Sequence, residues 1–274
     1  MKKIAILCAV LVAAFVSSCK KEKPEENKPI VEIPTPKGKL ELIFTPMVGD
    51  KGLYYDSAYT NPAGEVYELT TLKYYISDIG LSKADGSEVG VDGYRTKLVN
   101  YDSANFDAGY GMQSYKLTMN AAVGQYSDIR YDIGVPSEVN HKDATTNPYP
   151  LDLSVPGMYW NWNSGYVFLL AEGKGAGVAG DYFHFGIGTD LRMMSCFFGN
   201  MLVTTPKFEI KEGKTTRVYF TLDFNKVLKN QDGSNYSFGG YNFPQANVHG
   251  GYYADMIRSN VLQAIELQKV EIID

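Results

Sequence analysis

The sequence predicts an all-β protein, an antiparallel β-sandwich of the Ig-like or jelly-roll type with one short C-terminal helix. Many short segments alternate apolar or β-branched residues with polar ones, as half-buried strands do. Turn-forming residues separate these segments. The chain also contains 21 Tyr and 27 Gly, which suits strands joined by tight turns. Packing two such sheets face to face is the natural way to bury their apolar sides.

The expected elements follow one another along residues 38–274. Strands are predicted at residues 39–44, 70–81, 94–101, 114–119, 128–135, 166–171, 182–187, 207–210, 215–224 and 268–273. Turn residues lie at 84–87 and at 211–214, and the second turn is expected to join its two flanking strands as a hairpin. Residues 253–264 are expected to form the helix, because apolar residues recur there at helical spacing.

The N-terminus is typical of a secreted bacterial lipoprotein. Lys2 and Lys3 precede a short apolar run over residues 4–16, which is too short to span a bilayer as a mature helix. The run ends in Val16-Ser17-Ser18-Cys19, which resembles the lipobox read by lipoprotein signal peptidase. Residues 1–18 are therefore expected to be a signal peptide, removed before Cys19.

Cys19 is expected to carry the lipid that anchors the protein to the membrane. Residues 19–37, rich in Pro, Lys and Glu, are expected to form a flexible linker. We therefore expect a cell-envelope protein, held at the outer membrane and facing either the periplasm or the cell surface. The lipid anchor is its only expected contact with the membrane.

Charge and cysteine content exclude two classes of protein. The formal net charge is −5, and it becomes more negative once Lys2 and Lys3 are removed, which argues against nucleic-acid binding. Once Cys8 has left with the signal peptide and Cys19 is lipidated, only Cys196 is left, so no intrachain disulfide is expected. Cys196 is interpreted as a buried small apolar residue, with a soft metal ligand as the minority alternative.

No pattern typical of an enzyme is present, so no catalytic activity is expected. The glycines between residues 173 and 180 lack the strand–loop–helix context of a nucleotide site and are interpreted as a loop. The chain has three histidines, His141, His184 and His249. A structural role with ordinary hydrogen bonds is the simpler interpretation for each of them taken alone.

Both tryptophans lie in the segment 156–166, Pro-Gly-Met-Tyr-Trp-Asn-Trp-Asn-Ser-Gly-Tyr. If this segment is a strand, Met158, Trp160 and Trp162 share one face. Paired tryptophans of a sandwich usually belong to the core. The neighbouring Asn and Gly residues allow the edge of a cleft instead.

Several of these segments resemble the MbnP-like copper-binding proteins, named for a periplasmic partner of methanobactin. The resemblance begins at residues 72–79 (LKYYISDI) and continues through residues 131–136 (YDIGVP) and 140–141 (NH). It is sharpest at residues 157–166 (GMYWNWNSGY) and reaches residues 183–186 (FHFG). Order and spacing agree over roughly residues 38–270.

The resemblance implies a β-sandwich that binds one copper ion through histidines beside a tryptophan oxidised to kynurenine. A partner dihaem peroxidase is implied as the enzyme that carries out this oxidation. Carried over residue by residue, His141 and His184 are the implied ligands, and Trp160 rather than Trp162 is the implied modified residue. His249 has the weaker local match, near the C-terminal helix.

Copper agrees with these residue types, because imidazole suits copper and copper(II) binds most tightly of the divalent ions at nitrogen sites. Met158 can add a soft contact. Zinc also uses imidazole and is not excluded. The expected role is copper acquisition, buffering or sensing. The alternative is a glycan- or protein-binding module of an envelope assembly, using a face made by Tyr54, Tyr55 and Tyr59 or by Tyr236, Phe238, Tyr241 and Phe243.

Overall fold

The first sheet is built around β1 (Lys37–Val48), whose mixed run KGKLELIFTPMV is buried over most of its length. The structure is a computed structural model that describes residues 36–55, 57–92, 95–101, 114–161, 163–175, 182–199, 208–239 and 245–274. β1 pairs in parallel with β15 (Thr215–Asp223), which pairs with the closing strand β17 (Ile265–Ile273). The other edge of β1 pairs with β7 (Tyr115–Ala122) and, at its end, β2 (Lys51–Gly52).

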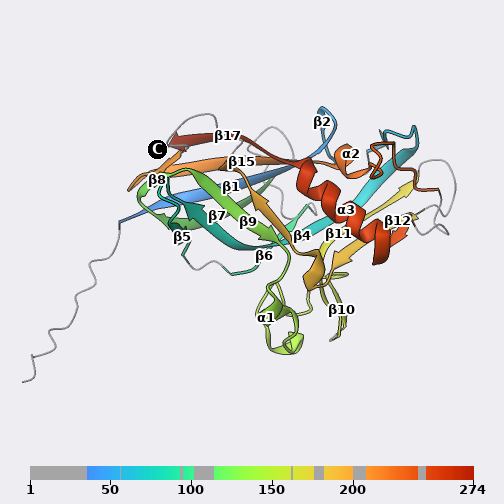
Figure 1. The fold of residues 1–274 in the computed structure, drawn as a ribbon, viewed down its shortest axis with the longest axis horizontal. Helices are drawn as coiled ribbons and strands as arrows, with labels where there is room; N and C mark the ends of the chain where they lie inside the picture. Colours follow the sequence, from blue (N-terminus) through green and yellow to red (C-terminus); the bar gives the residue numbers. More distant parts are fainter. Residues whose placement is uncertain are drawn as a thin grey trace, which may run out of the picture. The chain divides into compact units, whose positions relative to one another are not determined.

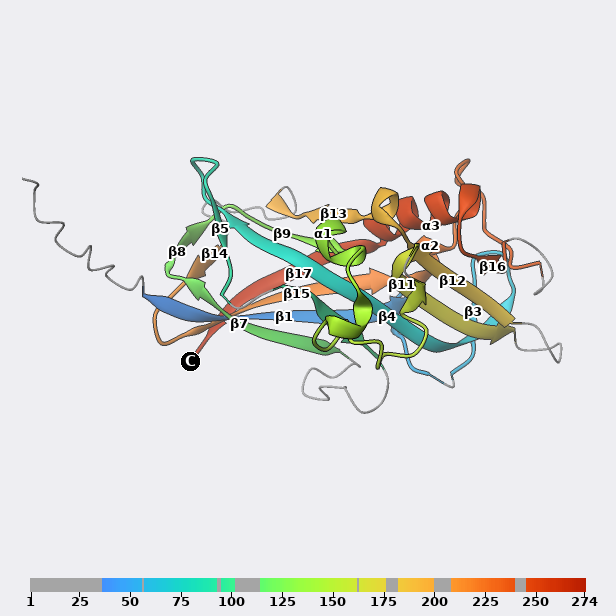
Figure 2. The same ribbon diagram turned by 90° about the horizontal axis from the view of Figure 1, so that it is seen from below.

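The second sheet is built around the long strand β4 (Val66–Ser82). It runs in the order β13 (Met194–Phe197), β9 (Asp128–Ile133), β4, β11 (Gly165–Gly175), β12 (Tyr182–Gly188) and β16 (Asn247–Val248). Four short strands pair with its interior strands: β3 (Tyr59–Thr60), β5 (Glu88–Gly90) and β6 (Lys97–Asn100) with β4, and β10 (Tyr159–Asn161) with β11. A further pair joins β8 (Gly124–Tyr126) to β14 (Phe208–Ile210). Figure 2 shows β4 running at an angle to β1 and β15.

Aromatic rings fill the space between the two sheets. Phe220 of β15 lies 5.4 Å from Phe44 of β1 and 5.3 Å from Tyr131 of β9, measured between ring centroids. Phe44 and Phe220 belong to the first sheet and Tyr131 to the second, so this cluster holds the two layers together. The predicted all-β sandwich is confirmed, and most of its strand pairs are antiparallel.

A second, smaller core lies on the opposite face of β4 and β11. Tyr75 of β4 and Tyr166 of β11 pack edge to face there, at 5.8 Å between ring centroids. The segment 135–158, which includes α1 (Ser137–Asn140), covers this face. Both faces of β4 are covered, so residues 72–77 are buried without interruption, as expected of a central strand.

The predicted C-terminal helix is α3 (Gly251–Ala264), and it directly follows the loop that carries His249. Ala254, Ile257 and Val261 are buried at helical spacing, so one stripe of the helix faces the core. α3 contacts the short helix α2 (Phe224–Val227) together with β12, β13 and β15 (Figure 1). It thereby covers one end of the sandwich.

Two expectations about connections are wrong. The turn at 211–214 forms, with Gly213 at φ +71°, but β14 and β15 do not pair as a hairpin: β14 pairs with β8, and β15 with β1 and β17. Gly173 and Gly175 lie in β11 rather than in a loop. A β-carbon at Gly173 would collide with the Glu68 carbonyl and the Phe183 ring, which explains glycine there. Gly177 and Gly180 lie outside the described residues.

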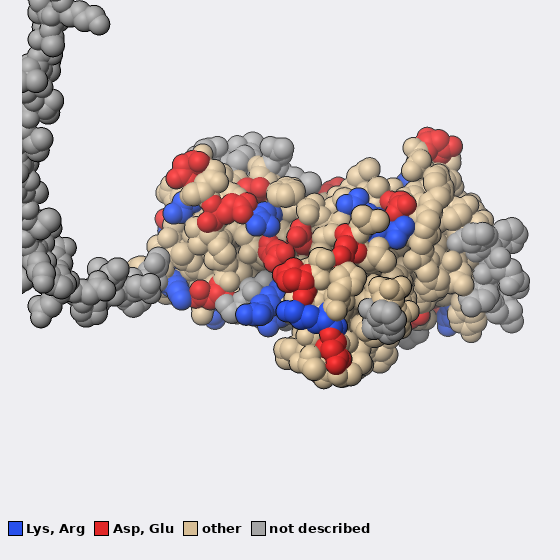
Figure 3. Space-filling model, turned by 60° about the horizontal axis from the view of Figure 1, so that its bottom comes forward, with Lys and Arg blue, Asp and Glu red and all other residues tan. Residues whose placement is uncertain are grey.

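The surface of the described part carries charges of both signs. On the face in Figure 3, the Lys and Arg side chains lie among Asp and Glu side chains. Among the residues that the structure describes, no helix has the length and apolar content needed to cross a membrane. Cys19 and the predicted signal peptide and linker up to residue 35 lie outside these residues.

Candidate metal site

His184 lies near the middle of β12, directly opposite Glu172 of β11 in the antiparallel register. Side chains at directly opposite positions lie on the same face of a sheet. Accordingly, Nδ1 of His184 is 2.9 Å from Oε1 of Glu172. The backbone of His184 is also fixed, because its N–H donates to the carbonyl of Ala246 at 2.7 Å.

The strand before His249, β16, positions this residue beside His184. β16 pairs in parallel with β12, with Asn247 level with His184 and Val248 level with Phe185. His249 directly follows β16, and its ring lies 4.6 Å from the His184 ring between centroids, with 38° between the ring planes. Residues 65 positions apart in the chain are therefore neighbours because of a two-residue strand.

Trp160 completes the group from β10, which pairs with the beginning of β11. Its ring lies 6.1 Å from that of His249, edge to face. All three side chains point to the space above Gly186. An atom at the β-carbon position of Gly186 would lie 3.0 Å from His184 Nε2, 3.3 Å from His249 Nδ1 and 3.2 Å from Trp160 Cζ2. Glycine at 186 keeps this space open.

The protonation state of His249 and an unpaired nitrogen of His184 both suit a cation. Partial burial, and then the nearby His184, lowers the pKa of His249 below its ordinary value of 6.5, so the neutral ring dominates at pH 7. His184 Nε2 is buried and has no hydrogen-bond partner among the described residues. An unpaired buried polar atom costs on the order of 1–3 kcal/mol, so its position calls for an explanation.

A metal ion explains this unpaired nitrogen well. A neutral imidazole donates a lone pair to copper or zinc, and its other nitrogen usually donates a hydrogen bond to a carboxylate or a carbonyl. His184 has this arrangement. The described residues contain no cluster of three or more His, Cys, Asp or Glu side chains suited to a metal, so the candidate site has two imidazole ligands.

The structure does not bring His141 to this pair. His141 follows α1, and its Nε2 lies 2.9 Å from Oδ2 of Asp190. The same carboxylate group accepts from Ser137 Oγ at 2.5 Å and from Asn140 Nδ2 at 2.8 Å. This cluster ties the segment after β9 to the turn after β12. His141 therefore makes the ordinary hydrogen bond of a structural histidine.

Met158 and Cys196 are both core residues. Met158 is 1% exposed and belongs to the smaller core with Tyr166 and Leu170. Cys196 is buried in β13, where burial raises the pKa of its thiol. Cys196 thus has the buried apolar environment that its sequence context predicts. Trp162 lies outside the described residues.

The aromatic residues of the alternative binding face are mainly internal. Tyr59, Tyr236 and Phe238 are buried in the main core, and Phe238 stacks on Phe183 at 4.5 Å between ring centroids. Tyr54 is 39% exposed. Tyr241 and Phe243 lie outside the described residues. The described residues of these two proposed faces therefore do not form a flat exposed row.

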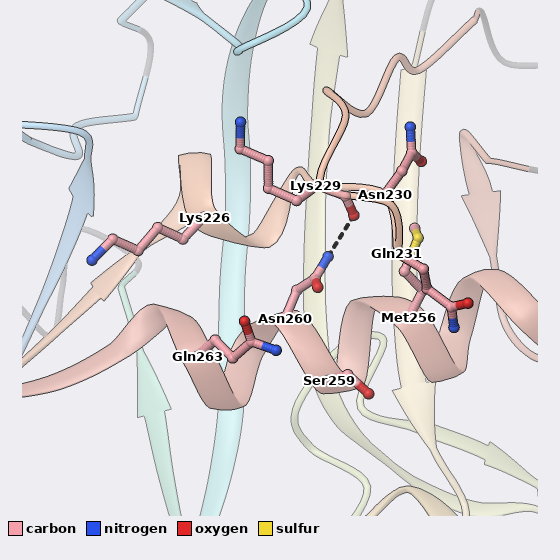
Figure 4. A pocket seen from close by; sticks show the side chains of 9 residues that line it. Lys226, Lys229, Asn230, Gln231, Met256, Ser259, Asn260 and Gln263 are labelled. Carbon is pink, nitrogen blue, oxygen red and sulfur yellow. Dashed lines mark hydrogen bonds between the residues drawn. The ribbon is translucent and has the colours of Figure 1, made fainter.

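A cavity of about 510 Å³ lies between α3 and the turn after α2 (Figure 4). Several of its polar side chains already have partners within the chain. Asn260 donates to the carbonyls of Val227 and Lys229, and Lys229 donates to Asn235 Oδ1 at 2.7 Å. Because its lining includes neither a histidine nor an aromatic ring, this cavity is a weaker candidate than the His184–His249 pair.

Three residues of the site were not singled out by the sequence: Glu172, Gly186 and Gly188. A β-carbon at Gly188 would lie 2.8 Å from Trp160 Cζ3 and 2.6 Å from the Tyr166 carbonyl oxygen, so both glycines make room for the indole. The alternation of residues 182–188 was a usable signal for Gly186 and Gly188, because it places both on the same face as His184. Nothing in the sequence pairs Glu172 with His184.

Fold and site together define an all-β sandwich domain with a candidate two-histidine metal site at a sheet edge. The sequence model of the MbnP family matches residues 37–246. The chain therefore belongs to the MbnP family, which confirms the resemblance seen in its motifs.

The structure of MbnP from Methylosinus trichosporium is similar, with a TM-score of 0.52 and 14% sequence identity. The match covers 79% of this chain and 82% of that chain. At this identity the likeness shows a shared fold. No curated protein sequence matches the chain.

Proposed function

We propose that this protein binds one copper ion through His184 Nε2 and His249 Nδ1, beside Trp160, and that it serves copper acquisition, buffering or sensing. Membership of the MbnP family suggests a copper-related role. The observation that carries the proposal is the approach of both imidazole nitrogens to one point above Gly186. The protein acts by holding the ion, without catalysis.

Copper suits this site better than other ions do. A pair of imidazoles is a low-coordinate nitrogen site, and copper accepts such ligands readily. Zinc in structural sites almost always takes four ligands, and two of them would have to come from outside this pair. His249 is exposed, so an ion can approach its ring from solvent.

Loss of either imidazole tests the proposal. His184→Ala and His249→Ala are each expected to weaken copper(I) binding by more than about 100-fold, beyond the 10–100-fold typical of losing a ligand's hydrogen-bond partner. Binding is measured on the purified protein by competition with a chromophoric copper(I) chelator. His141→Ala is the matched control and is expected to keep one copper per chain.

Two outcomes would reject the proposed ligands. The first is wild-type affinity in the His184→Ala, His249→Ala double variant. The second is a loss in His141→Ala as large as that in His184→Ala. A parallel titration with zinc alone identifies the preferred metal, and we expect zinc to bind more weakly than copper(I).

Trp160 is the proposed site of oxidation to kynurenine, with a dihaem peroxidase as the partner. Two molecules of peroxide supply the two oxygen atoms, and the indole C2–C3 bond breaks to give N-formylkynurenine and two waters. Hydrolysis then releases formate and leaves an aromatic amine on the side chain. The half-buried Trp160 ring lies edge to face with His249, so this amine would form next to the proposed ligands. Peptide mass spectrometry of protein from its native envelope tests this step, and an unmodified Trp160 in copper-loaded protein would contradict it.

The sequence of the N-terminus supports a place in the cell envelope. We infer that the chain is cut before Cys19 and held at the outer membrane by lipid on that residue. Cys19→Ser is expected to release the protein from the membrane fraction, whereas Cys196→Ala is expected to stay anchored. Equal membrane association of the Cys19→Ser variant would refute the anchor.

A further inference from the structure

We propose that Glu172 is a positioning residue that fixes the tautomer of His184, so that the lone pair of Nε2 faces His249. The inference rests on the proposed function, since it names the group that prepares one ligand of that site. It concerns the metal-free protein, in which the tautomer is already fixed.

The contact between Glu172 and His184 is held by the sheet. β11 lies between β4 and β12, so Glu172 belongs to an interior strand whose backbone is paired on both sides. Its carbonyl also accepts from Thr70 Oγ1 at 3.3 Å. The carboxylate therefore meets His184 Nδ1 from a fixed position and at hydrogen-bond distance.

The chemistry of this contact selects one tautomer. An ionised carboxylate only accepts hydrogen bonds, so Nδ1 of His184 must carry the proton. In the neutral ring this leaves the lone pair on Nε2. Nε2 is also the nitrogen that is buried without a partner and that faces the space above Gly186. The opposite tautomer would place a lone pair against the carboxylate and an N–H in the proposed metal site.

Asp190 provides an internal comparison. It also contacts a histidine, but it does so through Nε2 of His141, and it shares its carboxylate with Ser137 and Asn140. That contact holds a loop, and His141 faces no second histidine. Among the described residues, no other side chain bonds the Glu172 carboxylate, so this carboxylate is available to His184.

Two measurements on the full chain test the inference. The first is ¹⁵N NMR of histidine-labelled, metal-free protein. His184 is expected to be in the Nδ1–H form in the wild type and in Glu172→Gln, whose amide oxygen still accepts, and to lose this preference in Glu172→Ala. The second is copper(I) affinity, which is expected to fall about 10–100-fold in Glu172→Ala and less than about 10-fold in Glu172→Gln. Asp190→Asn is the matched control and should leave both measurements unchanged.

The outcomes separate this inference from the proposed function. An Nε2–H tautomer in the wild type, or full copper affinity in Glu172→Ala while His184→Ala abolishes binding, would overturn the role of Glu172 alone. Full copper affinity in His184→Ala would overturn the proposed function, and the NMR result would still decide the tautomer. If Glu172→Gln lost as much affinity as Glu172→Ala, the negative charge rather than the fixed tautomer would be the contribution of Glu172.

Discussion

At the scale of single residues, the candidate site depends on Gly186, which has no side chain. Gly186 lies inside β12 with ordinary extended backbone, so its conformation does not require glycine. Glycine is required instead by the space above this residue, because His184, His249 and Trp160 all approach within 3.3 Å of the β-carbon position. Even the smallest side chain would occupy the point on which the two nitrogens converge.

Gly186→Ala is therefore expected to weaken copper(I) binding by more than about 10-fold, because the methyl group occupies the space of the ion. Far-UV circular dichroism should stay unchanged, since contacts of 3.0–3.3 Å to side chains need only small shifts. Gly90→Ala is the control, because nothing lies within 4 Å of a β-carbon there. Wild-type copper affinity in Gly186→Ala would show that the ion binds elsewhere.

At the scale of elements, the turn between β3 and β4 supports the strand that carries His184. Glu65 in this turn accepts from Asn61 Nδ2 at 2.6 Å and from the Phe238 backbone N–H at 2.9 Å, and Ser237 also donates to it. Phe238 then stacks on Phe183, the residue before His184. A single carboxylate thus links the turn to the segment that packs on β12.

The pKa of Glu65 carries a prediction about stability. Partial burial raises this pKa, but the hydrogen bonds from Ser237, Phe238 and Asn61 together hold it below its ordinary value of 4.5. Because the folded pKa is the lower one, the stabilisation is present above the unfolded pKa and is lost as pH falls through the folded pKa.

Glu65→Gln is accordingly expected to lower the free energy of unfolding by about 1–2 kcal/mol at pH 7, since hydrogen bonds to a charged group are stronger than neutral ones. The difference from the wild type should shrink as the pH falls below 4.5. Urea denaturation across this pH range measures it, with Glu212→Gln in an exposed turn as control. A difference that stays constant with pH would refute the role of the charge.

At the scale of the whole molecule, the sandwich is held together by a few aromatic residues that contact both sheets. Phe220 contacts Phe44 in its own sheet and Tyr131 in the other, and its ring centroid is 4.7 Å from that of Phe198. It is 1% exposed, so its removal leaves a cavity at the joint between the layers.

Phe220→Ala is expected to lower the free energy of unfolding by about 3–5 kcal/mol, the usual cost of deleting a buried phenyl ring. Phe197→Ala is a matched control, because Phe197 is 63% exposed and should change stability by less than about 0.5 kcal/mol. Urea denaturation compares the two. A loss below about 1 kcal/mol in Phe220→Ala would mean that the sheets do not depend on this joint.

Much of the fold was predictable because it is local. Strands at 39–44, 70–81, 182–187 and 215–224 and the helix at 253–264 match observed elements, since the alternation and the helical spacing reflect burial on one face. The motif around Trp160 and the segment around His184 likewise marked two of the three places in the sequence that meet at the candidate site. His141 and Met158 matched the same family pattern, but one bonds Asp190 and the other packs in the smaller core.

The amino-acid sequence by itself determined the longest strands and the C-terminal helix, the all-β sandwich that they make, and which family the chain belongs to. Only the tertiary structure decided which strands pair: β1 with β15 in parallel, and β16 with β12 in the register that brings His249 to His184. The physical reason is that a side-chain period of two specifies the face of a strand but not its neighbour. The neighbour is chosen by contacts between residues far apart in the chain, and the two imidazoles meet through such contacts.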